Sequence, residues 1–300
     1  MRVFVTGATG FVGSAVVADL ISAGHRVLGL ARSDVSAAAL LRLGAEVHRG
    51  DLEDLASLRA GAVAADGVIH TGFIHDFARF KEVCDVDQRA IEALGTVLVG
   101  SDRPMIVTAG VAGVKAGVTG RPATEQDASP AVTDGYPRRS EQAAAALAAR
   151  GVRVSVVRLA PSVHGDGDHG FVSFLINIAR AKGVSAYVGD GQNRWAAMHR
   201  LDASHLYRRV LENGVNGANY HGVAEPEIAF RDIAEAIGRG LGLPVVAKSP
   251  AQAAEHFGWF AAFAALDCPT SSVATQAQLN WHPTQCGLIA DIDHGRYFTT

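Results

Sequence analysis

Cysteine is scarce in this sequence. The 300 residues include only Cys84, Cys268 and Cys286, which lie far apart and form no Cys-x-x-Cys pair. This odd number and wide spacing argue against a disulfide framework and against a zinc site. We therefore expect three reduced thiols, as is typical of a cytosolic protein.

Long apolar runs and blocks of basic residues are also missing. No apolar run approaches the roughly 20 residues that a membrane-spanning helix needs. The formal net charge is −3 and no Lys/Arg cluster stands out, so nothing indicates a nucleic-acid or anionic-membrane partner. The first predicted strand begins at Arg2, which leaves no room for a signal peptide. We expect a cytoplasmic protein that acts on a small molecule.

Hydrophobic residues, by contrast, make up 48% of the chain, which is enough for a sizeable core. In the first half, short apolar runs alternate with helical patterns such as Val12, Val16 and Leu20, as is typical of a doubly wound parallel sheet. The predicted strands lie at residues 3–5, 27–30, 46–48, 67–71, 105–108 and 154–159. We predict an α/β fold with a Rossmann domain over residues 1–160.

The pattern changes after Leu159. Gly, Pro and His cluster in residues 161–170. Helical patterns follow near residues 171–182, 230–241 and 251–265. We predict that residues 161–300 form mainly a smaller C-terminal substrate lobe, from which some segments return to the Rossmann sheet.

A long segment at 113–135, rich in Gly, Pro, Thr and Asp, precedes an alanine-rich helix predicted at about 140–150. Long loops inside compact domains are usually functional. We expect this loop to cover the active site.

A glycine-rich motif, Thr6-Gly7-Ala8-Thr9-Gly10-Phe11-Val12-Gly13, follows the first strand and opens the first helix. Gly7 allows a tight turn, Gly10 lets backbone N–H groups approach a pyrophosphate, and Gly13 lets the helix pack close to the sheet. The helix N-terminus adds its positive dipole. The motif predicts dinucleotide contacts from Gly7, Thr9, Gly10, Phe11, Val12 and Gly13.

The end of the second strand indicates which dinucleotide is bound. NAD sites commonly place an acid there, whereas a nearby arginine suits the 2′-phosphate of NADP(H). This chain reads Arg32-Ser33, with no acid until Asp34. We predict that Arg32 and Ser33 bind the phosphate, and that Asp51 and Leu52 cover the adenine. The other interpretation of Asp51 is a helix N-cap.

At these residues the chain resembles the extended and atypical short-chain dehydrogenase/reductases, which include the NAD-dependent epimerase/dehydratase group. The motifs that carry the resemblance are residues 6–13, Gly50-Asp51, His70-Thr71-Gly72, residues 158–165, Leu201-Asp202-Ala203 and Leu279-Asn280-Trp281-His282-Pro283. The resemblance implies a Rossmann fold, a C-terminal substrate lobe, a hydride-transfer cofactor and a homodimer. It also implies that the nicotinamide side is lined by Thr71, Gly72, Phe73, Pro161 and Val163.

The catalytic residues of that family are Ser, Tyr and Lys, and here the sequence departs from them. The fifth strand ends Thr108-Ala109-Gly110, so the usual serine position holds Ala or Gly. Tyr136 is present, but Ser140 stands where the lysine would follow it. We take Thr108 and Tyr136 as the candidate catalytic residues.

Two interpretations of Tyr136 stay open. In one, Tyr136 donates the proton, and Arg138 or Arg139 supplies the missing positive charge. In the other, Tyr136 is a loop aromatic, because counting back from Arg158 to Glu141 puts the family's Tyr and Lys positions at Thr133 and Pro137.

Histidines and one tryptophan of the second half are the candidate substrate contacts. These are His164, His169, Trp195 and His199. The alternative for His199 is a structural hydrogen bond with Asp202. We predict no metal site at 164–169, because glycines separate the ligands and no further set is evident.

The sequence therefore predicts an NADP(H)-dependent reductase of a small, mostly apolar carbonyl or imine. An imine accepts hydride already protonated and would not demand a lysine-activated tyrosine. The alternative is a non-catalytic NADP(H)-binding sensor, because the family's catalytic set is incomplete. Sugar-nucleotide epimerase activity is disfavoured for the same reason, and no Gly-x-Ser-x-Gly elbow favours a hydrolase.

Overall fold

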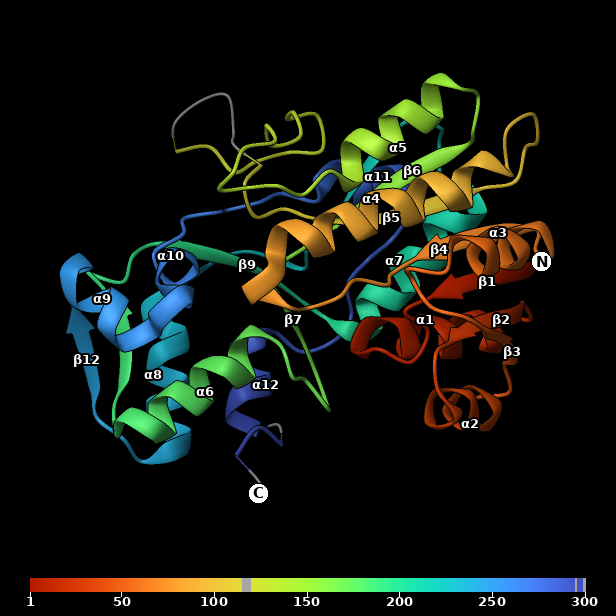
Figure 1. Cartoon of the computed structure of the whole chain (residues 1–300). Coiled ribbons are helices and arrows are strands. Elements are labelled where there is room, and N and C mark those ends of the chain that lie inside the picture. The colour runs from red at the N-terminus through yellow and green to blue at the C-terminus, as the bar shows by residue number, and fades with distance from the viewer. Residues whose placement is uncertain (115–119, 295, 299–300) are drawn as a thin grey trace.

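The computed structural model describes residues 1–114, 120–294 and 296–298 of the chain. A seven-stranded parallel sheet, in the order β10-β6-β5-β4-β1-β2-β3, forms the centre of the N-terminal half (Figure 1). The strands are β1 (Arg2–Thr6), β2 (Arg26–Ala31), β3 (Glu46–Arg49), β4 (Gly67–His70), β5 (Met105–Gly110), β6 (Val154–Leu159) and β10 (Asn219–Gly222). This is the strand order of a doubly wound Rossmann sheet with one added strand, so the predicted fold class and its six strands are confirmed.

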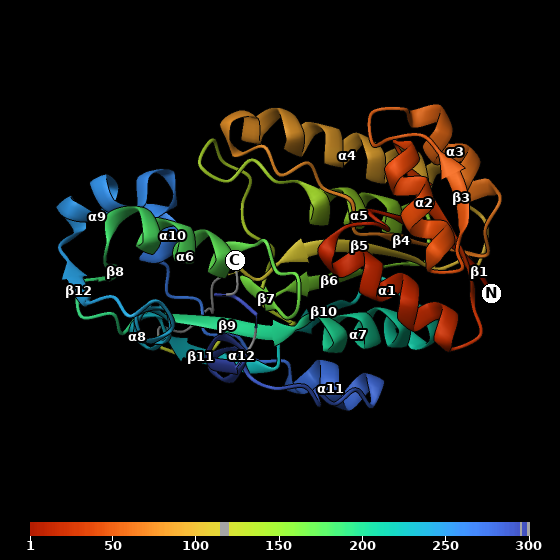
Figure 2. The ribbon, with the colours of Figure 1, turned by 90° about the horizontal axis from the view of Figure 1, so that it is seen from below.

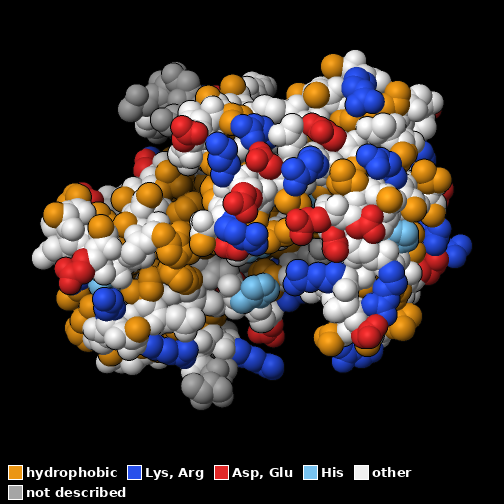
Figure 3. Space-filling view, viewed as in Figure 1, with side chains coloured by type: hydrophobic (Ala, Val, Ile, Leu, Met, Phe, Trp, Pro, Cys, Tyr) orange, Lys and Arg blue, Asp and Glu red, His pale blue; other side chains and the backbone are white. Residues whose placement is uncertain are grey.

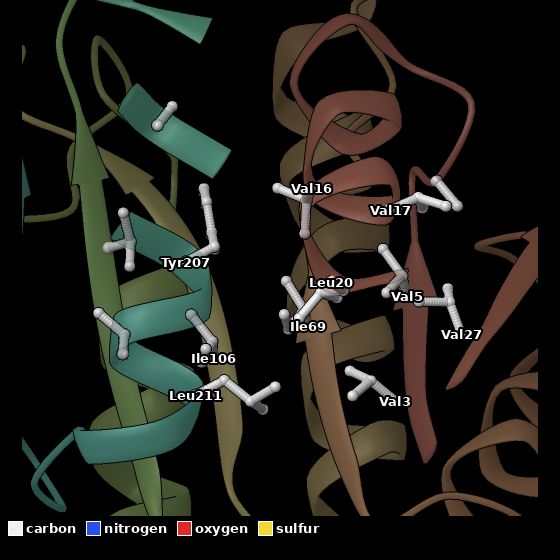
Figure 4. Close-up of a cluster of buried hydrophobic side chains, with 14 of the residues drawn as sticks. Val3, Val5, Val16, Val17, Leu20, Val27, Ile69, Ile106, Tyr207 and Leu211 are labelled. Carbon is white, nitrogen blue, oxygen red and sulfur yellow. The ribbon is translucent and has the colours of Figure 1, made fainter. Parts of the chain in front are cut away.

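Helices cover both faces of this sheet. Six helices do so: α1 (Phe11–Ser22), α2 (Asp34–Arg42), α3 (Leu55–Val63), α4 (Phe80–Thr96), α5 (Ser140–Ala149) and α7 (Arg200–Asn213). The apolar stripes of α1, α2 and α7 bury one face of the strands, and those of α3, α4 and α5 bury the other (Figure 2). Figure 4 shows Val16 and Leu20 of α1 together with Tyr207 and Leu211 of α7 over the sheet residue Ile69. Burial on both faces explains why the strands read as continuous apolar runs.

Part of the second half of the chain belongs to this sheet. Strand β10 pairs with β6, beginning with Asn219 beside Val156. Helix α7 packs against α1, and the short helix α11 (Val273–Leu279) places Leu279 in the same core. The chain therefore crosses from the lobe back to the Rossmann half before it ends.

The C-terminal lobe is built around two small sheets. These sheets are β11-β9-β7 and β12-β8, with β7 (Ser162–His164), β8 (Ser185–Val188), β9 (Arg194–His199), β11 (Glu225–Ala229) and β12 (Val245–Lys248). The packed helices are α6 (Phe171–Lys182), α8 (Phe230–Leu241), α9 (Pro250–Phe257), α10 (Ala261–Ala264) and α12 (Leu288–His294). Trp195, Phe230 and Phe260 lie fully buried at its centre.

The structure divides the helix predicted at 251–265. Helix α9 stops at Phe257, a 3₁₀ turn (Gly258–Phe260) follows, and α10 begins at Ala261. Gly258 has a φ of +59°, a left-handed conformation that interrupts a helix and that glycine adopts without strain. The apolar periodicity continues across the break, which is why the sequence pattern did not reveal it.

The predicted loop at 113–135 is held to the C-terminal half. Ala123 exchanges backbone hydrogen bonds with Pro269 and Ser271. Residues 115–119 of this loop lie outside the described residues.

The three cysteines are free thiols. Burial raises the pKa of Cys84 to about 11 and that of Cys268 to about 12. In the part of the chain that the structure describes, no helix is both long and apolar enough to span a bilayer.

Candidate functional site

The glycine-rich loop has the close contacts that its motif requires. Gly7 has a φ of +65°, and a Cβ there would lie 2.7 Å from the backbone nitrogen of Gly72. A Cβ on Gly13 would lie 2.0 Å from the carbonyl oxygen of Gly7. Gly10 is exposed, and a Cβ there would meet only the Gly7 oxygen, at 3.2 Å. Two of the glycines therefore allow tight packing, and the third leaves space for a ligand.

Helix α1 begins without a side-chain cap. Gly10 is its N-cap and contributes no side-chain hydrogen bond. The N–H groups of Phe11 and Val12, in the first helical turn, have no intrahelical acceptor. Such an uncapped N-terminus suits a pyrophosphate, so the residues present fit a dinucleotide.

The residues expected at the nicotinamide end are tied to the end of β1. The Thr71 hydroxyl donates to the Thr6 carbonyl at 2.7 Å, and the Gly72 N–H donates to the Thr6 hydroxyl at 3.3 Å. Leu52 lies beside Gly72. These contacts place Phe73 just past the carboxyl end of β4, where ligands bind in α/β sheets. The other two expected residues, Pro161 and Val163, are half-buried at the start of the lobe.

The residues expected at the adenosine end are exposed. Arg32 has no side-chain partner among the described residues, while Ser33 caps α2 by accepting from the Ser36 N–H at 3.2 Å. Asp34, the first acid after β2, forms an ion pair with Arg49, so a neighbouring arginine already compensates its negative charge.

Asp51 caps a turn and not a helix. Its carboxylate accepts from the N–H groups of Glu53 at 2.8 Å and Asp54 at 3.0 Å. The N-cap of α3 is Asp54, so the interpretation of Asp51 as an N-cap is wrong.

A buried polar chain runs from β1 to the start of α5. Thr6 Oγ1 lies 2.8 Å from His70 Nδ1, and His70 Nε2 lies 3.1 Å from Asp87 Oδ1. The Ser140 hydroxyl donates to Asp87 Oδ2 at 2.5 Å. Burial opposes ionisation of Asp87, but the hydrogen bonds from His70 and Ser140 and the charge of Arg138 outweigh it and lower its pKa. Asp87 is thus a buried carboxylate facing the site.

This chain ends on Arg138. Its Nε donates to the Ser140 hydroxyl at 2.9 Å, and its Nη2 donates to the Thr108 carbonyl at 3.0 Å. The guanidinium lies over the ring of Phe73, 4.8 Å from its centroid. Arg139 instead pairs with Asp85 at 2.8 Å. Of the two candidate arginines, Arg138 is the one whose charge reaches the end of β5.

Tyr136 lies beside Arg138 and is half-buried. Burial raises the pKa of its phenol, and the positive charge of Arg138 lowers it by less. Tyr136 is the last residue of a tight turn. Its N–H donates to the Thr133 carbonyl at 3.1 Å, and its carbonyl accepts from the Thr133 N–H at 3.0 Å. Thr133 is exposed and Pro137 is buried, and because neither threonine nor proline has a titratable side chain, the second register supplies no proton donor of the tyrosine kind.

The family model described as "NAD dependent epimerase/dehydratase family" matches residues 3–223 of this chain. The chain belongs to this family. A dinucleotide of the NAD(P) type is the cofactor typical of the family.

Some relatives match this chain over nearly its whole length. An uncharacterized protein of Schizosaccharomyces pombe is 46% identical over 99% of this chain and 100% of its own length. Another, of Saccharomyces cerevisiae, is 46% identical over 97% of this chain and 98% of its own. The structure of a dTDP-glucose 4,6-dehydratase from Streptomyces venezuelae, with NAD bound, superimposes with a TM-score of 0.78 at 19% identity, covering 99% of this chain and 97% of that one.

The hydroxyl of Thr108, a candidate catalytic group, is engaged by the protein itself, and its catalytic role stays a prediction. This hydroxyl donates to the His70 carbonyl at 2.7 Å and lies 2.7 Å from the hydroxyl of Tyr207, which is fully buried. The Thr108 proton is therefore committed to the protein interior. Thr108 contributes to the site through its carbonyl, which holds Arg138.

Two of the predicted substrate contacts, Trp195 and His164, are wrong. Trp195 has no exposed surface, and its indole N–H donates to the Phe263 carbonyl at 3.2 Å within the lobe core. His164 is 1% exposed and its Nδ1 lies 2.8 Å from Asp291. Both side chains hold the lobe together and have no free face for a substrate.

The other two histidines lie near α1. His169 is exposed, with its ring 5.7 Å from that of Phe11. His199 caps α7 by accepting from the Leu201 N–H at 3.2 Å, whereas Asp202 accepts from the backbone at residues 284 and 285. The predicted pairing of His199 with Asp202 is therefore wrong. His199 lines a cavity of about 540 Å³ whose other walls include Arg200 and Asp291.

Sequence reasoning missed Asp87, Ser140 and Arg200 as parts of the site. Arg200, the first residue of α7, donates to the Ser14 hydroxyl at 2.8 Å and to the Asp166 carbonyl at 2.9 Å, so it links the start of α1 to the first loop of the lobe. Its guanidinium lies 4.5 Å from the Phe11 ring centroid. Asp87 had a detectable signal, since it is an acid among the buried positions Val83, Val86, Ala90 and Ile91 of an amphipathic helix. Among the described residues, no cluster of His, Cys, Asp or Glu could hold a metal ion.

Proposed function

We propose that this protein is an NADP(H)-dependent reductase of a small, mostly apolar carbonyl compound. The observation that supports it most is the position of Arg138. Its Nε and Nη2 have protein partners, while Nη1 has none among the described residues and remains for a ligand. A fixed guanidinium at the carboxyl end of β5, beside Phe73, can stabilise the negative charge that develops on a carbonyl oxygen.

The reaction divides between cofactor and protein. NADPH, when bound, supplies the hydride for the new C–H bond. Phe11 and Val12 N–H groups bind its pyrophosphate, and Arg138 orients the substrate oxygen and stabilises its negative charge. The Tyr136 phenol then donates its proton to that oxygen, which completes the alcohol, and Arg138 stabilises the tyrosinate until solvent reprotonates it.

The same charge favours a carbonyl over an imine. A ketone gains negative charge on its oxygen as hydride adds, so Arg138 attracts the transition state more than the ground state. A protonated imine arrives positively charged and is repelled by the guanidinium. Imine reduction therefore becomes the second choice.

The preference for NADP(H) is supported by the end of β2. Arg32 is exposed without a partner among the described residues, and Asp34 is paired with Arg49. An unpaired arginine suits a 2′-phosphate, which can accept paired hydrogen bonds from it.

Two more distant relatives have names that support oxidoreduction. One is the 4-hydroxy-2-methyl-3-oxo-4-farnesyl-3,4-dihydroquinoline-1-oxide ketoreductase of Stigmatella aurantiaca, 27% identical over 73% of this chain and 67% of its own length. The other is the decarboxylating sterol-4-alpha-carboxylate 3-dehydrogenase of Dictyostelium discoideum, 26% identical over 77% of this chain and 73% of its own.

To test the proposal, the purified protein is titrated with NADPH and with NADH to measure binding. Oxidation of the bound nucleotide is then followed by the nicotinamide absorbance in the presence of ketones, aldehydes and cyclic imines. Turnover of a ketone or aldehyde with NADPH supports the proposal. Turnover of imines alone would replace carbonyl reduction by imine reduction. Tight NADPH binding without turnover of any compound would favour the sensor, the function suggested by the missing family serine and lysine.

A further inference from the structure

A row of aromatic rings leads from Arg138 to the C-terminal lobe. Phe73, under the guanidinium, lies 6.4 Å from Phe80, and Phe80 lies 5.8 Å from Phe77. Phe77 then stacks on Trp259 with centroids 4.6 Å apart and an interplanar angle of 18°. The first three rings follow β4, whereas Trp259 belongs to the lobe, so the row joins the two halves of the molecule.

The outer end of this row is supported from the lobe and yet open to solvent. Phe171 lies 6.5 Å from Phe77, and Phe174 lies 5.2 Å from Trp259. Trp259 nevertheless keeps 49% of its surface exposed. Figure 3 shows hydrophobic side chains gathered on the edge of the lobe that faces the N-terminal half. An exposed indole fixed in place beside a site indicates a binding surface.

Polar groups stand at the two ends of the row. Arg138 marks the inner end. Asp76 and Arg79 lie beside the outer end and pair with each other at 2.9 Å. A ligand that matches this arrangement carries one polar group at one end and flat apolar surface along the rest.

We infer that the substrate is an aromatic ketone or aldehyde with more than one ring, whose rings stack along this row while its oxygen meets Arg138. The contact between Phe77 and Trp259 is of the kind that a substrate ring would make with either of them. Stacking orients the ring, and the guanidinium selects the end that carries the oxygen. This inference rests on the proposed reduction and adds the class of substrate.

Matched substrates and variants test it. 4-Acetylbiphenyl and its fully saturated counterpart, 4-acetylbicyclohexyl, share the methyl ketone and two six-carbon rings but differ in the aromatic faces. Trp259→Leu and Phe77→Leu keep an apolar side chain and remove a ring, and Val215→Ala, at another exposed apolar position, is the control. We expect KM for 4-acetylbiphenyl to rise about 10-fold in both ring variants and KM for the saturated ketone to change about twofold at most, with kcat unchanged.

Equal changes for both ketones, or a wild type without preference for the aryl compound, would overturn the inference. Calorimetric titration of the NADP⁺-loaded protein with the same ketones separates it from the proposed function. If no ketone is turned over, tighter binding of 4-acetylbiphenyl that is lost in Trp259→Leu still supports the ring site and leaves the reductase proposal at fault. Equal binding of the two ketones would reject the ring site.

Discussion

Asp87 and Arg138 are coupled through a single hydroxyl. Ser140 donates to the buried carboxylate at 2.5 Å and accepts from the guanidinium at 2.9 Å, so an acid on α4 fixes an arginine at the end of β5. In family members with the usual set, a lysine in the helix provides the positive charge. In this chain Ser140 stands four residues after Tyr136, where one of the two interpretations expects that lysine, and we propose that Arg138, two positions earlier, supplies the charge. The predictions below follow from this arrangement.

Removing the charge of Arg138 should slow the reaction. We expect kcat/KM of Arg138→Met to fall about 100-fold, the effect of losing one donor to a developing oxyanion, with NADPH affinity unchanged. Arg138→Lys should recover part of the loss. Arg139→Met is the matched control, because Arg139 pairs with Asp85 outside the site. Equal losses in the two Met variants would show that Arg138 has no special role.

Asp87→Asn should loosen Arg138 and destabilise the fold by about 2 kcal/mol in urea unfolding, because a buried charged hydrogen-bond acceptor is lost. Folding lowers the pKa of Asp87. Its contribution to stability is therefore present above the unfolded-state value of about 3.9 and disappears as pH falls through the lower folded value.

The stability difference between wild type and Asp87→Asn should accordingly shrink below about pH 4. Asp85→Asn, which changes a half-exposed acid two residues away, is the control for general effects on α4. If Asp87 positions Arg138, kcat of Asp87→Asn should also fall while its affinity for NADPH stays unchanged. Loss of stability without any change in kcat would reduce Asp87 to a structural residue.

Tyr136→Phe tests the proton donor. Burial raises the pKa of Tyr136, so the phenol holds its proton throughout the neutral range. Because burial raises the pKa of this donor above the ordinary tyrosine value of about 10, kcat/KM of the wild type should stay level through neutrality and decline only at more alkaline pH. The variant should lose about 100-fold in kcat and also lose this alkaline decline. Tyr187→Phe, in the lobe sheet, is the matched control, and an unchanged profile in Tyr136→Phe would assign the proton to another group.

Arg32→Glu should reverse the preference between cofactors. We expect NADPH to bind about 100-fold more weakly and NADH to be affected little, because only the 2′-phosphate loses a charged partner. Arg42→Glu, at the other end of α2, controls for the change in net charge. Equal weakening of both nucleotides would contradict a phosphate contact by Arg32.

Local patterns were enough to predict the sheet. Five of its first six strands contain an apolar run, whereas β3 has only Val47 among polar residues, and the spacing of Gly7 and Gly13 marks the turn between β1 and α1. The choice between Arg138 and Arg139 could not be made this way. The two side chains are adjacent in sequence and point to different partners, Ser140 for Arg138 and the distant Asp85 for Arg139. Trp195 and His164 were wrongly expected to contact the substrate, because the partners that bury them lie far along the chain.

Transfer of deuterium from 4-deuterated NADPH to an aryl ketone, followed by mass spectrometry, tests the central claim most directly. We predict an alcohol labelled at its carbinol carbon with the wild type, formed about 100-fold more slowly by Arg138→Met. Bound NADPH without label in the alcohol from any carbonyl compound would contradict a reductase. Equal rates of labelling by the two proteins would contradict the role given to Arg138.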